Sequence, residues 1–202
     1  MHKFILSVFA VASLASAGPI STLDFEGLGV SQSTAIPQTY GDRLANTPNV
    51  VVDYGTNSGV VAFYISGYSN LRNVAWGTGN PSVSTITFTA DPGFNVSLLS
   101  LNIGYWSSIN SNTGIFVSDG KGNKLWEYKT ATPNPLPANA PLLSPNVTAE
   151  KLVLTWGNSW GIAVDNIQFS QDLLVNTVPE PSTLALVAIA GLAAAGARRF
   201  RH

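Results

Sequence analysis

Asp165 is the side chain whose surroundings most favour chemistry. It lies in a run of alternating residues, 161–169, that is typical of a β-strand. Alternation predicts that its face is shared with apolar residues and turned toward the core: Ala163, Ile167 and Phe169. A buried carboxylate must be paired, protonated or bound to a metal, because burial without a partner is very costly. Ca²⁺ is a suitable partner, since it takes carboxylate oxygens. The alternatives are capping of backbone amides, or an ion pair with Arg43, without a metal.

The part of the chain expected to fold, residues 18–177, lacks the side chains most used in nucleophilic catalysis. The sequence has no cysteine, and its two histidines, His2 and His202, lie at the two ends. This excludes serine–histidine–aspartate and cysteine–histidine machinery, and histidine-ligated zinc, from the folded part. A glycosidase needs two carboxylates about 5–10 Å apart, and no acidic pair lies in a motif that suggests one. We therefore expect no catalysis, with a polysaccharide-acting enzyme as a less favoured alternative.

Tryptophan side chains are the candidates for a glycan-binding surface. Sugar rings stack on exposed aromatic faces because their axial C–H groups meet the negative face of the ring. Glycine-rich and asparagine-rich surroundings predict loop positions for Trp76 and Trp160. Their polar neighbours for a glycan are Asn80 and Asn158. Two other tryptophans lie in predicted strands and are expected in the core: Trp126 and Trp156.

A row of threonines could serve a different kind of surface. Thr85, Thr87 and Thr89 lie on one face of a predicted strand. Ice-binding surfaces use flat arrays of regularly spaced threonines, but one row is ordinary on an exposed strand. Ice binding is therefore the least favoured binding function.

The elements that must position these residues are short strands. Runs with period-2 alternation are separated by glycine, proline, asparagine and serine, which predicts an all-β domain over residues 18–177. A tight turn is expected at 119–123, and a surface loop over the proline-rich residues 132–145. The number of strands suits a two-sheet β-sandwich, in particular a jelly roll. The expected strands are 20–26, 49–54, 59–66, 82–90, 94–106, 113–118, 123–129, 150–156 and 161–169.

Both ends of the chain are expected to be processing signals. Residues 1–17 have the order of a signal peptide, with a basic start, an apolar helical run and a small-x-small cleavage site at 15–17. The C-terminal segment has a polar proline motif at 178–183, an uncharged apolar run at 184–197 and a basic tail at 198–202. The 17 uncharged residues at 181–197 reach the lower limit for a single transmembrane helix, and the following arginines favour a cytoplasmic end.

The C-terminal segment combines Pro179, Glu180 and Pro181 with the apolar run and with Arg198 and Arg199. In this order it resembles the PEP-CTERM sorting signal, a tail also labelled the ice-binding protein C-terminal domain. The resemblance implies recognition and cleavage by exosortase, a membrane cysteine protease, in a precursor held in the inner membrane. It also implies a bacterium that makes exopolysaccharide and biofilm, with the mature protein at the cell surface or outside the cell. The alternative is a permanent tail anchor without processing.

Four segments of the body carry a second resemblance: 23–28, 91–94, 117–120 and 161–169. They are similar to parts of jelly-roll carbohydrate-binding modules with the galactose-binding-like fold. In such jelly rolls the first and last strands lie side by side and hold a structural calcium through acidic residues. The resemblance therefore implies Glu26 and Asp165 as Ca²⁺ ligands, with Asp42 as a third from a loop and Asp24 as a weaker one.

Charge argues against nucleic acid as a partner. Residues 18–177 hold ten acids and six bases, a net charge of −4, without a basic stripe. We expect an exported, exosortase-processed protein of the cell surface or extracellular matrix, associated with biofilm or exopolysaccharide and without catalytic activity. The alternative is a calcium-stabilised carbohydrate-binding module whose partner is exopolysaccharide or another matrix glycan.

Overall fold

The computed structural model describes residues 18–106, 113–130, 138–157 and 160–174 of the 202-residue chain. The predicted signal peptide and sorting tail lie outside these residues. Within the described part, all regular secondary structure is β-strand. These residues contain no helix that is long and apolar enough to cross a membrane. The strands are β1 (Ile20–Leu23), β2 (Val50–Thr56), β3 (Val61–Tyr68), β4 (Leu71–Gly77), β5 (Val83–Ala90), β6 (Phe94–Tyr105), β7 (Thr113–Asp119), β8 (Lys124–Thr130), β9 (Leu142–Leu143), β10 (Val147–Ala149), β11 (Lys151–Gly157) and β12 (Ile162–Leu173).

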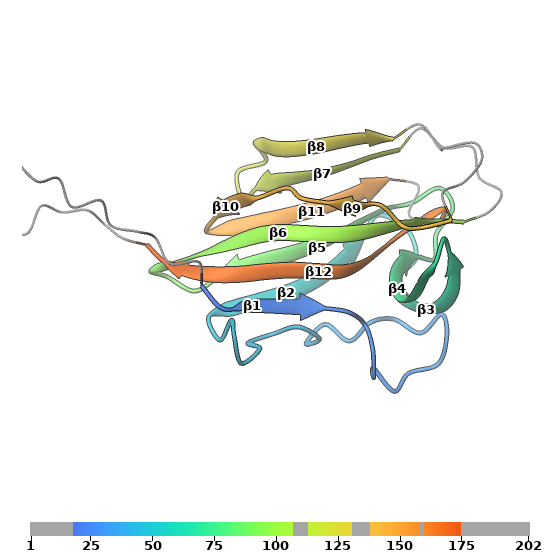
Figure 1. Cartoon of the computed structure of the whole chain (residues 1–202), viewed down its shortest axis with the longest axis horizontal. Helices are drawn as coiled ribbons and strands as arrows, with labels where there is room; N and C mark the ends of the chain where they lie inside the picture. The colour runs from blue at the N-terminus through green and yellow to red at the C-terminus, as the bar shows by residue number, and fades with distance from the viewer. Residues whose placement is uncertain (1–17, 107–112, 131–137, 158–159, 175–202) are drawn as a thin grey trace, which may run out of the picture.

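Two antiparallel sheets form the fold, which confirms the all-β prediction (Figure 1). One sheet has the order β10-β6-β12-β4-β3, with β1 paired to β12 and β9 paired to β6. The other has the order β2-β5-β11-β7-β8. The long strands β6 and β12 run side by side through the first sheet, and the second sheet lies behind it (Figure 1).

The core lies between the two sheets because alternate residues of each strand are apolar. In β5, Ile86 and Phe88 are fully buried, whereas the alternating threonines at 85, 87 and 89 are only partly buried. The rings of Phe88 and Phe169 meet across the core with centroids 5.0 Å apart. Trp156 in β11 is fully buried, as the sequence predicted. Burial of each such side chain contributes about 1.5–3 kcal/mol.

All nine predicted strands are present, with ends shifted by up to four residues, and three further strands were not predicted: β4, β9 and β10. The strand β4 was not predicted, because Asn73 and the glycine at its end are poor strand residues. Asn73 has a positive φ of 56° and is held in the strand by tertiary pairing with β3. The short strand β9 lies within the predicted proline-rich loop, of which residues 131–137 lie outside the described part.

A β-bulge in β12 changes which residues face the core. The register with β6 shifts between Asp165 and Gln168, and Asn166 has a positive φ of 49°. Consequently Val164 and Ile167 both belong to the inter-sheet core, although three positions separate them. The predicted common face of Asp165 with Ile167 and Phe169 is therefore wrong, because Asp165 lies on the outer face of the sheet.

The β3–β4 hairpin docks on the end of β6 through a close backbone approach. Ser69 N donates a hydrogen bond of 3.1 Å to Tyr105 O, and Tyr68 forms an isolated bridge with Trp106. Gly104 makes room for this contact, because a Cβ there would lie 2.6 Å from Tyr68 O and 2.7 Å from Tyr68 Cβ. The position of the hairpin therefore depends on a glycine at 104.

Replacing Gly104 by alanine is expected to lower the free energy of unfolding by about 1–3 kcal/mol, because the new methyl group overlaps backbone atoms. Gly114→Ala is the matched control, since a Cβ there would meet only Glu127 Oε1 at 3.8 Å. This control is expected to stay within about 1 kcal/mol of the wild type. Urea unfolding of both variants measures the difference. Equal stability of the two variants would contradict the close approach.

Candidate functional site

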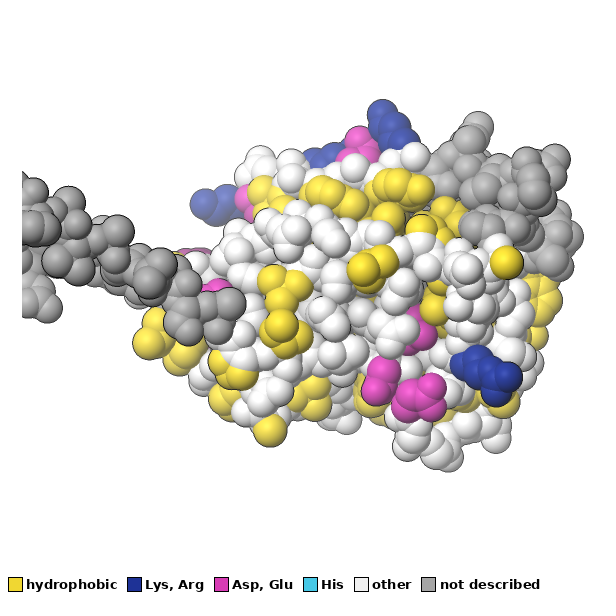
Figure 2. All heavy atoms as spheres, viewed as in Figure 1, with side chains coloured by type: hydrophobic (Ala, Val, Ile, Leu, Met, Phe, Trp, Pro, Cys, Tyr) yellow, Lys and Arg dark blue, Asp and Glu magenta, His cyan; other side chains and the backbone are white. Residues whose placement is uncertain are grey.

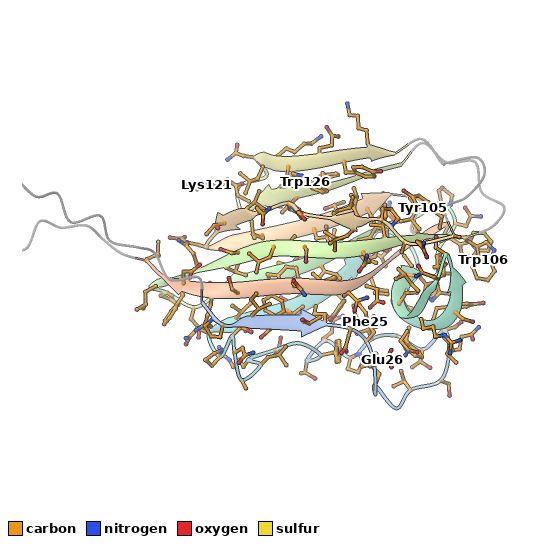
Figure 3. The ribbon with its side chains drawn as sticks, viewed as in Figure 1. Phe25, Glu26, Tyr105, Trp106, Lys121 and Trp126 are labelled. Atoms are coloured by element: carbon orange, nitrogen blue, oxygen red, sulfur yellow. The ribbon has the colours of Figure 1, made fainter. Side chains whose placement is uncertain are left out.

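Five aromatic side chains gather on the outer side of the first sheet, where β12 begins. We call this group the aromatic end; it consists of Tyr64, Tyr68, Trp76, Trp106 and Trp160. The ring of Tyr64 lies 5.3 Å from that of Trp76 and 5.5 Å from that of Trp106, in edge-to-face arrangements. Trp106 also contacts Trp160, with centroids 6.3 Å apart. Figure 3 labels Trp106 at the end of the molecule beside β3 and β4.

Members of the aromatic end differ in exposure, which decides which of them a ligand can reach. Trp76 is 8% exposed and lies in β4, so its predicted loop position is wrong and it serves packing. Tyr68 is also buried, and its hydroxyl donates a hydrogen bond of 2.6 Å to Trp160 O. Tyr64, Trp106 and Trp160 are half-buried. These three offer the accessible aromatic surface.

The predicted polar neighbours contribute less to this surface. Asn80 is exposed in the turn after β4, next to a cis bond to Pro81. Asn158 lies outside the described residues. Trp106 was not predicted as a binding residue, although it ends the alternating run of β6 and is followed by small polar residues. Its ring packs against Gly67, where any Cβ would clash with the indole.

A second group of side chains gathers where β1 ends beside the bulge of β12. Asp165 is only 4% exposed. Its carboxylate accepts hydrogen bonds from Asn166 N at 2.7 Å and from Asn166 Nδ2 at 3.1 Å. The charges of Asp24 and Glu26 act on it from the end of β1. Acidic side chains gather in this region in Figure 2, and Figure 3 labels Glu26 there.

Burial raises the pKa of Asp165 to about 8. The hydrogen bond from Asn166 N opposes this rise, and the charges of Asp24 and Glu26 add to it. Tyr40 completes the group, because its hydroxyl accepts from Phe25 N at 2.9 Å and donates to Asp24 at 3.3 Å. Burial, followed by the charge of Asp24, raises the pKa of Tyr40 to about 12.

Two further residues considered from the sequence, the acid Asp42 and the base Arg43, have other partners. The carboxylate of Asp42 accepts a hydrogen bond of 2.6 Å from Val52 N. Arg43 forms a two-pronged ion pair with Asp91, with N–O distances of 2.6 and 3.0 Å. The structure therefore brings Asp24 and Glu26 near Asp165. Of the two metal-free alternatives, it shows that Asp165 caps a backbone amide, that of Asn166. In the described part, no group of three or more acids, histidines or cysteines is arranged to hold a metal.

Comparison with known proteins identifies the C-terminal segment. The family model described as the PEP-CTERM protein-sorting motif matches residues 177–201. The chain therefore carries this motif, which confirms the prediction of an exported protein that exosortase sorts and that the membrane anchors transiently. None of the curated proteins compared matches the chain.

Solved structures resemble the body only distantly. The arabinose-bound α-L-arabinofuranosidase MgGH51 has 15% identity and a TM-score of 0.40, over 77% of this chain and 26% of that one. The enzymatically active domain of bacteriophage CBA120 tailspike protein 4 has 14% identity and a TM-score of 0.30, over 70% of this chain and 21% of that one. This chain thus spans about a quarter or a fifth of each protein, and likeness at this level carries no argument about activity.

Stability is expected to fall as pH rises from about 5 to about 8. The folded protein keeps the proton of Asp165 up to a pKa of about 8, whereas the unfolded chain releases it near 3.8. Rising pH therefore favours the unfolded state across this window. Asp165→Asn should flatten the fall in thermal midpoint, while Asp53→Asn, at an exposed position of β2, should keep it. An unchanged slope in Asp165→Asn would contradict burial as the cause.

Proposed function

We propose that this chain is a protein of the cell surface or extracellular matrix that associates with exopolysaccharide and has no catalytic activity. The sorting motif at 177–201 carries the proposal, because it marks an exported substrate of exosortase. The composition supports it, since residues 18–177 contain neither histidine nor cysteine. The role is therefore one of binding or assembly.

The fold supports a role in which the body holds its accessible aromatic rings away from the sorting tail. Ile20 pairs with Ser170, so the described body begins beside the place where it ends, and Figure 1 shows the start of β1 and the end of β12 on the same side. The aromatic end lies at the opposite end of β12, where Ile162 pairs with Tyr105. The 12 residues of β12 separate the two by roughly 40 Å. The sorting tail thus follows the end of the sandwich that is remote from the accessible aromatic rings.

Replacing Pro179, Glu180 and Pro181 together by alanine is expected to prevent processing in an exosortase-bearing bacterium. The wild type should occur as a shortened form in the surface or matrix fraction, detected by immunoblotting and mass spectrometry. The variant should stay at precursor length in the inner-membrane fraction. A shortened variant that reaches the matrix in wild-type amount would contradict the proposal.

A carbohydrate-binding module is the second candidate, and the aromatic end favours it. Tyr64, Trp106 and Trp160 form one accessible aromatic surface supported by buried Tyr68 and Trp76. Stacking of sugar C–H groups on such rings is worth about 0.5–1.5 kcal/mol for each ring. The rings are held by mutual contacts, so little side-chain freedom is lost on binding.

Trp160→Ala is expected to weaken binding to the exopolysaccharide of the host about tenfold. The variant keeps the hydrogen bond from Tyr68, because the acceptor is the backbone oxygen of residue 160. Leu173→Ala is the matched control, at an exposed apolar position of the opposite end. Affinity electrophoresis compares the three proteins. Equal binding by Trp160→Ala and by the control would exclude the carbohydrate-binding module. The aromatic end would then have a purely structural role.

We also propose that Ca²⁺ stabilises the body through the pair of carboxylates of Glu26 and Asp165. The support is the nearly complete burial of Asp165 beside two further acids. Ca²⁺ would neutralise these carboxylates and take further oxygen ligands from the backbone or water. Its role would be structural.

With about 1 mM Ca²⁺ at pH 8, the thermal midpoint of the wild type is expected to rise above that in EDTA, because a ligand of the native state stabilises it by mass action. The rise should vanish in Asp165→Asn and remain in Asp53→Asn. Coincident melting curves of the wild type in Ca²⁺ and EDTA would exclude the site.

A further inference from the structure

The start of the described chain lies against the end of β12. Ile20 pairs with Ser170 in an antiparallel register, and this register continues along β1 to Leu23. Extended by two residues in the other direction, it places Gly18 opposite Asp172. Figure 1 shows the start of β1 beside the end of β12. The residue that precedes β1 by two positions therefore lies next to an acidic residue.

Gly18 approaches β12 more closely than a residue with a side chain could. A Cβ at this position would overlap the backbone oxygen of Gln171 and would lie 3.3 Å from Asp172 Oδ1. Because the nitrogen of Gly18 is bonded to the same Cα, it lies within roughly 6 Å of this carboxylate oxygen. Pro19 disfavours helical conformations of the residue before it, which keeps Gly18 extended along β12.

The carboxylate of Asp172 is partly buried and is held through one of its two oxygens. Oδ2 accepts a hydrogen bond of 3.3 Å from Ser97 Oγ. Ser97 is only 6% exposed, and its hydroxyl shares a second hydrogen bond of 2.6 Å with Thr148 Oγ1. Among the described residues, Oδ1 has no donor and Asp172 forms no ion pair. The oxygen nearest Gly18 can therefore accept from a cation.

Removal of the signal peptide supplies a cation at this place. The sequence predicts cleavage after the small-x-small residues 15–17 by a signal peptidase, which makes Gly18 the first residue. Hydrolysis adds the hydroxyl of water to the carbonyl of residue 17 and leaves an amine on Gly18. This amine takes up a proton at neutral pH, whereas the same nitrogen in the precursor belongs to an uncharged amide. Opposite charges about 4–6 Å apart attract one another.

We infer that Asp172, held by Ser97, is the binding site for the α-ammonium group that cleavage creates on Gly18. The inference rests on the export proposed above and on cleavage at the predicted site. The ion pair joins the start of β1 to the end of β12 in the mature protein only. Glycine is required at position 18 because a side chain would push the amine away from β12.

The place of this ion pair gives it a role in maturation. Asp172 lies five residues before residue 177, where the sorting motif begins. Chain ends fray unless they are tied to the fold. The ion pair therefore fixes both ends of the body once the signal peptide has gone, including the strand end that leads to the sorting tail.

A divalent cation would be a different occupant, and the ligands disfavour it. Ca²⁺ takes about six to eight oxygen ligands, whereas this place offers one carboxylate and the hydroxyl of Ser97. A metal ion would also leave the close approach of Gly18 unexplained.

A double-mutant cycle on the exported protein, purified from an exosortase-bearing bacterium, tests the inference. The four proteins are the wild type, Asp172→Asn, a variant with one alanine inserted between residues 17 and 18, and the combination. The insertion moves the new amine by one residue, about 3.8 Å along the chain. Asparagine keeps an oxygen for Ser97 and removes the charge. We expect Asp172→Asn to lower the thermal midpoint by roughly 2–4 °C in the wild type and by less than about 1 °C in the inserted variant.

Hydrogen exchange measured by mass spectrometry gives the local readout. Peptides that cover 18–23 and 168–174 should exchange faster in Asp172→Asn than in the wild type, and the difference should shrink in 1 M NaCl. Asp53→Asn, at an exposed position of β2, is the control and should leave these peptides unchanged.

N-terminal sequencing of the wild type should give Gly18 as the first residue. Equal effects of Asp172→Asn with and without the inserted alanine would overturn the inference. A first residue other than Gly18 would overturn it as well. Neither result touches exosortase sorting, which the variant of Pro179, Glu180 and Pro181 tests, so failure here is distinct from failure of the proposed function.

Discussion

The pairing of β6 with β12 is the constraint on which the rest of the structure depends. These two 12-residue strands cross the middle of the first sheet, and β1 and β4 attach to β12 while β9 and β10 attach to β6. Both strands change phase midway. Core residues lie at 96, 98, 101, 103 and 105 on β6, and at 162, 164, 167 and 169 on β12. The shift keeps both halves of each strand packed on the core while it turns Asp165 outward.

Both candidate sites follow from this pairing. At one end of the β6–β12 pair, Trp106 N donates a hydrogen bond to Gly161 O. This bond brings Trp106, the residue that follows β6, close to Trp160. At the bulge, the outward carboxylate of Asp165 meets the end of β1, where Asp24 and Glu26 lie. The bulge is therefore a local strand irregularity that creates a buried, acid-flanked carboxylate. Such a group must be protonated, capped or neutralised by a cation.

Sequence patterns predicted the features that depend on local alternation or on motif order. These were the two-sheet architecture, most strands, the core position of Trp156 and the sorting tail. The same sequence patterns failed to predict the conformation where long-range strand pairing decides it. Strict alternation cannot reveal a bulge that needs Asn166 at positive φ. The loop-like surroundings of Trp76 do not reveal that pairing with β3 makes them a strand.

The aromatic end gives the body a surface suited to sugars. Residues 18–177 are also poor in catalytic groups, because they contain neither histidine nor cysteine. The central claim is that this protein binds polysaccharide without cleaving it. One measurement tests it most directly: incubation of the purified chain with the host exopolysaccharide, with bound polymer and new reducing ends measured in the same sample. The account predicts bound polymer and a constant number of reducing ends. Reducing ends that accumulate with time, and that stop accumulating when a single acidic residue is replaced by its amide, would contradict it.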